Sequence, residues 1–116
     1  MKDSGDCIVE FFFLIPLRLN NNRKVPNSYF NKLEDELFRL CGGHRVEGRV
    51  KGAYKMADGS RQLDELLKYV VALPASKENV LREILQRCAV ELDQESIYFG
   101  KTGAQIEFLQ NPKLNP

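Results

Sequence analysis

Two stretches of the chain are apolar at both odd and even positions, which is the pattern of a strand buried on both faces. The first is Ile8–Leu17, and the second is firm over Leu66–Leu73. Strands that are covered on both faces lie at the centre of a sheet. Pro16 lacks a backbone N–H, so we expect it near the end of the first strand or at a bulge.

The segment Arg45–Met56 alternates between charged and uncharged positions. Its charged positions are Arg45, Glu47, Arg49, Lys51 and Lys55. This alternation predicts a strand with one wet and one buried face, and a row of charge is typical of a protected sheet edge. The following Asp58-Gly59 predicts a hairpin turn into the strand that ends at Leu73.

Apolar residues at helical spacing predict two helices. The first begins near Asn27 or Ser28 and ends at the glycine pair Gly42-Gly43. The second is expected to have Ser76 as its N-cap and to turn its apolar residues inward as far as Leu92. Both helices are therefore expected to cover a sheet with one apolar stripe each.

The last part of the chain is predicted as strand and turn. Gln94–Phe99 is expected to form a fourth strand and Gly100–Gly103 a turn. Ala104–Leu109 then forms either a short fifth strand or a continuation of the fourth past a bulge. The resulting order β-α-β-β-α-β is that of a split βαβ unit.

We therefore predict an α+β fold of the ferredoxin-like split βαβ type. It has an antiparallel four-stranded sheet in the order 4-1-3-2 with two helices on one face, and a single domain over residues 1–116 with an ordered core of about 7–109. The helices leave the second face of the sheet uncovered. Either Ala104–Leu109 or a second copy of the chain is expected to cover it, and we favour a homodimer.

Several short motifs have a familiar spacing. Cys41-Gly42-Gly43 is followed by Gly52-Ala53-Tyr54, by Asp58-Gly59 and by Gln94-Glu95-Ser96-Ile97-Tyr98. Over roughly residues 28–100 this pattern resembles small uncharacterised bacterial proteins with a ferredoxin-like fold. The resemblance implies a fold and no established activity. Cys41 and His44 stand where those proteins more often carry aromatic and hydroxyl-bearing residues.

Composition narrows the function classes. The net charge of +1 gives no general attraction to nucleic acid or to an anionic membrane. Three widely spaced cysteines and one histidine predict no disulfide framework, no metal site and no cofactor, and indicate a cytoplasmic protein with cysteines in its core. The N-terminal apolar run is interrupted by Glu10 and Pro16 and is too short to span a membrane.

A few residues are candidates for chemistry. His44 could act as a general base, and Cys41 could act as a nucleophile near it, although capping and core roles are the commoner alternatives. Tyr54, Tyr69 and Tyr98 could converge on a pocket. We take His44, Tyr54 and Tyr69 as the candidate ligand-binding residues.

The basic positions of the charged strand give a different hypothesis. Arg45, Arg49, Lys51 and Lys55 could contact phosphates of a nucleic acid, with a solvated edge strand as the alternative. Three functions therefore remain open. They are self-association or protein binding through the sheet, small-molecule binding or catalysis in a cleft, and nucleic-acid binding, of which we favour the first.

Overall fold

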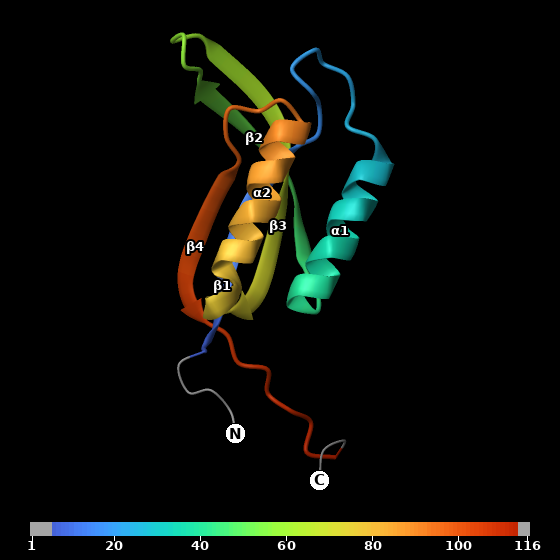
Figure 1. The fold of residues 1–116 in the computed structure, drawn as a ribbon, viewed down its shortest axis with the longest axis vertical. Helices are drawn as coiled ribbons and strands as arrows, with labels where there is room; N and C mark the ends of the chain where they lie inside the picture. Colours follow the sequence, from blue (N-terminus) through green and yellow to red (C-terminus); the bar gives the residue numbers. More distant parts are fainter. Residues whose placement is uncertain (1–5, 114–116) are drawn as a thin grey trace.

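Residues 6–113, described here from a computed structural model, form a four-stranded antiparallel sheet that carries two helices on one face (Figure 1). The strands lie in the order β2-β3-β1-β4, which is the predicted order counted from the other edge. The elements are β1 (Ile8–Pro16), α1 (Asn27–Cys41), β2 (Arg45–Lys55), β3 (Arg61–Pro74), α2 (Glu78–Glu91) and β4 (Tyr98–Gln105). The ferredoxin-like α+β fold is confirmed.

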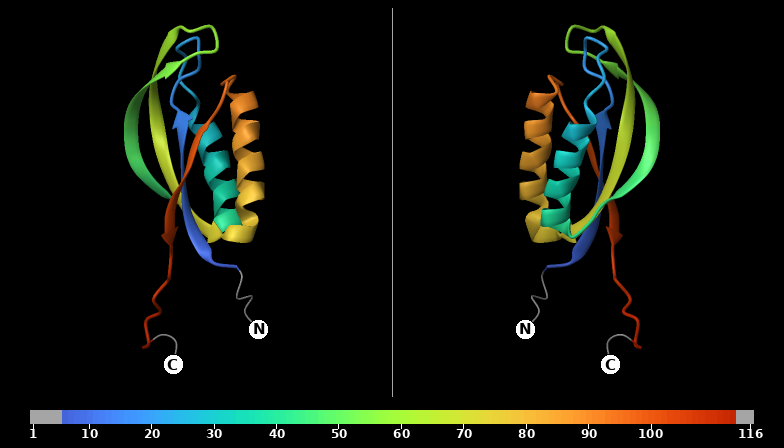
Figure 2. Two further views of the ribbon diagram at one scale, coloured as in Figure 1. Left: turned by 90° about the vertical axis from the view of Figure 1, so that its left-hand side faces the viewer. Right: turned by 90° about the vertical axis from the view of Figure 1, so that its right-hand side faces the viewer.

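The core lies between the sheet and the helices, and Figure 2 shows both helices on the same side of the sheet. Side chains at alternate positions of the two central strands point into this core. Phe13 of β1 stacks on Tyr69 of β3 with ring centroids 5.4 Å apart, and both residues are fully buried. The prediction that β1 and β3 are the central strands is therefore correct.

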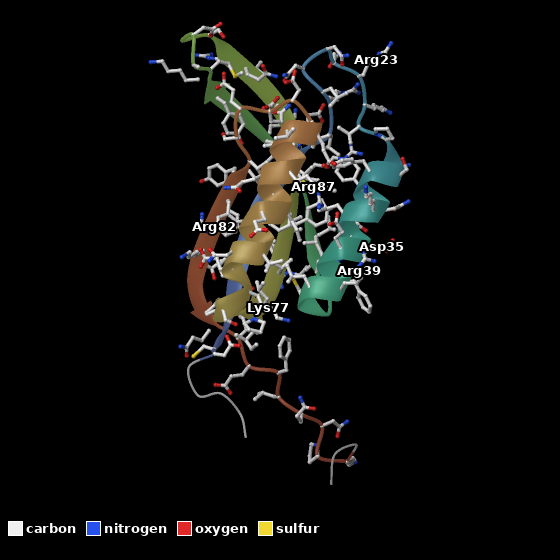
Figure 3. The ribbon with its side chains drawn as sticks, viewed as in Figure 1. Arg23, Asp35, Arg39, Lys77, Arg82 and Arg87 are labelled. Atoms are coloured by element: carbon white, nitrogen blue, oxygen red, sulfur yellow. The ribbon has the colours of Figure 1, made fainter. Side chains whose placement is uncertain are left out.

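The starts of both helices differ from the prediction. α2 begins after Lys77, and the predicted cap Ser76 lies in a short 3-10 helix (Ala75–Lys77) before it. In α1, Pro26, and not Asn27 or Ser28, is the residue before the helix, and it provides no side-chain cap. The other end of α1 is as predicted, because Gly42 adopts a φ of 76° and its N–H donates to the carbonyl of Phe38 at 2.9 Å. Figure 3 shows Arg87 on α2, where it pairs with Glu36 of α1 and ties the two helices together.

The charged strand does not keep its charges on one face. A β-bulge between Val46 and Gly48 inserts Glu47 as an extra residue in β2. Arg45 therefore lies opposite Val70, on the face away from the helices, whereas Arg49 lies opposite Leu67, on the helix-bearing face. The prediction of one continuous row of charge is wrong, because one extra residue reverses the alternation.

The predicted turn at Gly100–Gly103 is also wrong, because β4 continues through it. Between the pairs Phe11–Lys101 and Val9–Gln105 the register shifts, so the strand passes a bulge that contains Gly103 at a φ of 80°. Among residues 6–113 there is no separate fifth strand. Beyond Gln105 the chain runs away from the sheet, as Figure 1 shows.

The face of the sheet without helices is called the open face below. The remaining alternate positions of the central strands point to this face. Of these, Leu66 and Val70 are buried, and Phe12 and Leu14 are partly buried. The Phe12 ring lies over Gly100, where a Cβ atom would approach the ring to 2.4 Å. The apolar character predicted for this face is present. A covering second copy remains a prediction.

Candidate functional site

A cleft of about 530 Å³ opens on the open face, at the end of the sheet opposite the chain termini. Its floor comes from Leu14 of β1 and Leu66 of β3. Its walls come from the β2–β3 hairpin and from the loop between α2 and β4. We call it the acidic cleft; the polar and aromatic side chains that line it include Tyr54, Gln62, Asp64, Asp93, Gln94, Glu95 and Tyr98.

The loop between α2 and β4 is held in place by contacts with two other segments. The Asn20 side chain donates to the carbonyl of Asp93 at 2.7 Å and accepts from the Gln94 side chain at 3.2 Å. The Glu95 carboxylate accepts from the backbone N–H of Ala57, in the hairpin turn, at 3.3 Å. Three segments distant in sequence are thereby fixed around one cavity.

Two tyrosines form the aromatic part of the cleft. The Tyr54 ring lies flat against β2 because Gly52 leaves room for it; a Cβ at Gly52 would meet the ring at 2.9 Å. Tyr98 begins β4 and exposes 54% of its surface. Partial burial raises the pKa of Tyr54, and the nearby Asp64 and Tyr98 act in the same direction. The Tyr54 phenol is thus neutral at physiological pH, and the two rings give the cleft apolar-faced walls.

The charges of the cleft are unbalanced. Asp64, Asp93 and Glu95 make no ion pair with any residue in 6–113, and Lys55 is the only lysine or arginine on the lining. Carboxylates beside exposed aromatic rings attract a cation, because the rings add a cation–π attraction to the Coulomb term. The cleft therefore suits a positively charged molecule with a flat, apolar part.

Of the three predicted ligand-binding residues, only His44 and Tyr69 come together. Their rings lie 5.7 Å apart beneath α1, on the helix-bearing face. Glu34 of α1 joins them, accepting the Tyr69 hydroxyl at 2.7 Å and lying 3.6 Å from Nε2 of His44. Tyr54 lies on the open face, so the three residues do not line a single cleft.

The His44 cluster is a packing contact in this structure. Tyr69 is fully buried, and burial together with the hydrogen bond to Glu34 raises its pKa. Nδ1 of His44 is buried without a hydrogen-bond partner in the described chain. The Tyr69 residue and Nδ1 of His44 are buried, and the cluster contributes to the attachment of α1.

The cysteines do not support nucleophilic chemistry. Burial raises the pKa of Cys41 to about 11, which leaves the thiol protonated at neutral pH. Cys88 is buried, as predicted for a core cysteine, whereas Cys7 is exposed, contrary to that prediction. All three cysteines are free thiols.

The predicted nucleic-acid-binding residues point to separate places. Arg45 pairs with Glu10 at 3.6 Å and with Glu47 at 2.7 Å on the open face. Arg49 lines a cleft beside α1, Lys51 lines a groove along the hairpin, and Lys55 lines the acidic cleft. The four side chains therefore form no single basic surface.

No group of three or more histidine, cysteine, aspartate or glutamate residues in 6–113 has the geometry to hold a metal ion. Of the helices in that range, none combines the length and the apolar character needed to cross a bilayer.

Sequence reasoning missed the acidic side of the site. Tyr54, Tyr69 and Tyr98 were expected to converge; Tyr54 and Tyr98 do, whereas Tyr69 lies on the helix-bearing face. Asp64, Asp93 and Glu95 were not identified. The alternation of residues along the hairpin shows which face of the sheet Asp64 occupies only once the β2–β3 register is known. Asp93 and Glu95 reach the cleft because Asp93, at a φ of 52°, turns the chain after α2. No local pattern in the sequence marks that turn.

No family model matches the chain, and no curated protein matches it. Among solved structures, it is similar to a phage S-adenosylmethionine (SAM) lyase in complex with S-methyl-5′-thioadenosine. The TM-score is 0.59 at 12% identity, and the alignment covers 92% of this chain and 89% of the lyase chain. At that identity the similarity shows a shared fold.

Proposed function

We propose that the chain binds a small, positively charged molecule of the S-adenosyl sulfonium type in the acidic cleft. The observation that carries the proposal is the set of three carboxylates without ion-pair partners in residues 6–113, placed beside two tyrosine rings around a cavity of about 530 Å³. A cavity of this size is in the range of small-molecule sites. The fold shared with a SAM lyase supports the choice of ligand class.

The chemistry of the cleft matches the parts of such a ligand. A sulfonium is a positive charge without hydrogen-bond donors, so aromatic faces and carboxylates stabilise it more than oriented acceptors do. The adenine ring would stack against Tyr98 or Tyr54. The amide side chains of Gln62 and Gln94 can hydrogen-bond to base or ribose edges.

Isothermal titration with a matched pair of ligands tests the proposal. SAM carries the sulfonium, and S-adenosylhomocysteine is the same molecule with a neutral thioether. We expect SAM to bind at least about fivefold more tightly, since one partly screened charge contact contributes about 1 kcal/mol. Chromatography of the same mixture reports any cleavage to S-methyl-5′-thioadenosine.

Two variants make the test specific. Asp64→Asn should weaken SAM binding about fivefold and leave S-adenosylhomocysteine unchanged. Glu107→Gln removes the same charge from an exposed position outside the cleft and should alter neither affinity. Equal affinities for the two ligands, or equal effects of the two variants, would refute cation recognition by the cleft.

A second function, self-association through the open face in a reducing cytoplasm, is favoured by a different observation. Phe108 and Leu109, which follow β4, expose 65% and 87% of their surfaces, and Phe108 lines a hollow together with Val70 and Ala72 of the open face. The three free cysteines fit a reducing compartment. Light scattering across a dilution series tests the homodimer, and a monomeric mass at every concentration would exclude it.

A further inference from the structure

A second cleft, of about 540 Å³, lies on the helix-bearing face, beside the first turn of α1. Three cationic side chains line it: Arg18 and Lys24 from the loop between β1 and α1, and Arg49 from β2. We call it the basic cleft. It lies across the sheet from the acidic cleft, because Arg49 and Tyr54 occupy opposite faces of β2.

The backbone brings these three cations together. Arg18 and Lys24 face each other in an isolated antiparallel bridge, held by the hydrogen bond from the N–H of Val25 to the carbonyl of Leu17 at 2.9 Å. Nη1 of Arg18 also donates to the carbonyl of Asn22 at 3.1 Å. Arg49 reaches this face because the bulge at Glu47 reverses the alternation of β2.

These cations lack the partners that other cations of the chain have. Arg45, Lys68, Arg82, Arg87 and Lys101 each make an ion pair with a carboxylate. Among residues 6–113, none of the three lining cations has a carboxylate within 4.0 Å. Mutual repulsion in a concave site is relieved most directly by a bound anion.

The carboxylates on the lining do not cancel this charge. Glu34 is engaged by the Tyr69 hydroxyl and by His44. Glu65 is exposed and has no side-chain partner in the described residues. Three cations against two carboxylates leave the cleft net positive, and the side chains of Asn27 and Asn31 add amide donors.

We propose that the basic cleft binds a small anion that carries a phosphate or carboxylate group. Arg18 and Arg49 provide the planar donor pairs that match such groups, and Lys24 provides a point charge. The cleft has the volume of a small-molecule site; Lys51 lines an adjoining groove that shares Arg18 and Glu65 with it, and Lys55 lines the acidic cleft. The ligand is therefore a small molecule.

Isothermal titration of the full chain with inorganic pyrophosphate tests this proposal. Arg49→Gln and Lys24→Gln should each weaken binding at least about fivefold. Glu65→Gln should strengthen it about threefold, because it removes the one unengaged negative charge on the lining. The matched control is Arg39→Gln, at the C-terminal end of α1 and far from the loop that carries Arg23 (Figure 3), which should leave binding unchanged.

Three results would overturn the proposal. One is the absence of pyrophosphate binding at millimolar concentration. Another is equal weakening by Arg49→Gln and Arg39→Gln, which would mean attraction to the net charge and no defined site. The third is tight binding of a single-stranded RNA that depends on Arg49 and that pyrophosphate does not displace. SAM binding in the acidic cleft should be unaffected by Arg49→Gln, so failure at one site is distinguishable from failure at the other.

Discussion

The hydrogen bond from Tyr69 to Glu34 leads to a prediction that changes sign with pH. Tyr69→Phe removes a hydroxyl from a fully buried residue that donates to a carboxylate at 2.7 Å. A hydrogen bond to a charged group contributes about 1.5–3 kcal/mol. Glu34 exposes 32% of its side chain and can take up water instead, so we expect a loss of about 1–2 kcal/mol near neutral pH.

The pKa of Tyr69 determines the pH dependence. Its ordinary value is 10.0, and burial with the hydrogen bond to Glu34 raises it in the folded state. The stabilisation from a raised pKa is complete below the unfolded value and falls as pH rises above it, because only the unfolded chain then releases the proton. At a pH of about 11 the released proton stabilises the unfolded chain by about 1.4 kcal/mol.

The phenylalanine variant has no such proton to lose. The stability difference between the unmodified chain and Tyr69→Phe should therefore shrink above a pH of about 10, approach zero near pH 11 and reverse beyond it. Urea unfolding followed by circular dichroism over this range measures both curves. Tyr98→Phe, which removes a solvent-exposed hydroxyl, is the control and should change stability by less than about 0.5 kcal/mol. A difference that stays constant from about pH 8 to about pH 11 would refute the reasoning.

Three further outcomes are expected. Leu81→Ala, at a fully buried position of α2, should lower the free energy of unfolding by about 2–5 kcal/mol, and a loss below about 1 kcal/mol in urea unfolding would place Leu81 outside the tight core. Gly100→Ala should cost about 1–3 kcal/mol, because its Cβ would meet the Phe12 ring at 2.4 Å; a compensating Phe12→Ala in the same chain should recover part of that loss, and no recovery would contradict the clash. In the folded protein near pH 8, a thiol reagent should label Cys7 well before Cys41, and equal rates would contradict the burial that raises the pKa of Cys41 to about 11.

The sequence predicted the central strands because their pattern does not depend on distant contacts. A strand that is apolar at both parities is typical of a central position in a sheet, and β1 and β3 are the two central strands. β4 was predicted in part: its continuation past a bulge was one of two alternatives and is confirmed, whereas the turn at Gly100–Gly103 was wrong because the glycines resemble a turn. Gly100 is instead required by the Phe12 ring above it, and Gly103 by the positive φ of a bulge. Both requirements come from the neighbouring strand.

The candidate sites were predicted only in part. Tyr54 and Tyr98 converge as expected, since strands at known positions of a known fold place them on one face. The carboxylates of the acidic cleft depend on the turn after α2 and on the exact register of the hairpin. The basic cleft depends on the bulge at Glu47, and one extra residue in a strand leaves no signal in an alternating pattern.

That bulge has a consequence for how the chain can change by insertion or deletion. Removing Glu47 alone would restore a regular ladder in which the other residues of β2 keep their β3 partners and their faces, because Glu47 is the extra residue of the bulge. Arg45 and Lys68 would lose Glu47 as an ion-pair partner, whereas the pair between Arg45 and Glu10 would remain on the open face. The sheet could thus absorb a codon-sized deletion at Glu47 without moving any charge from one face to the other, unlike a deletion at a regularly paired position of β2.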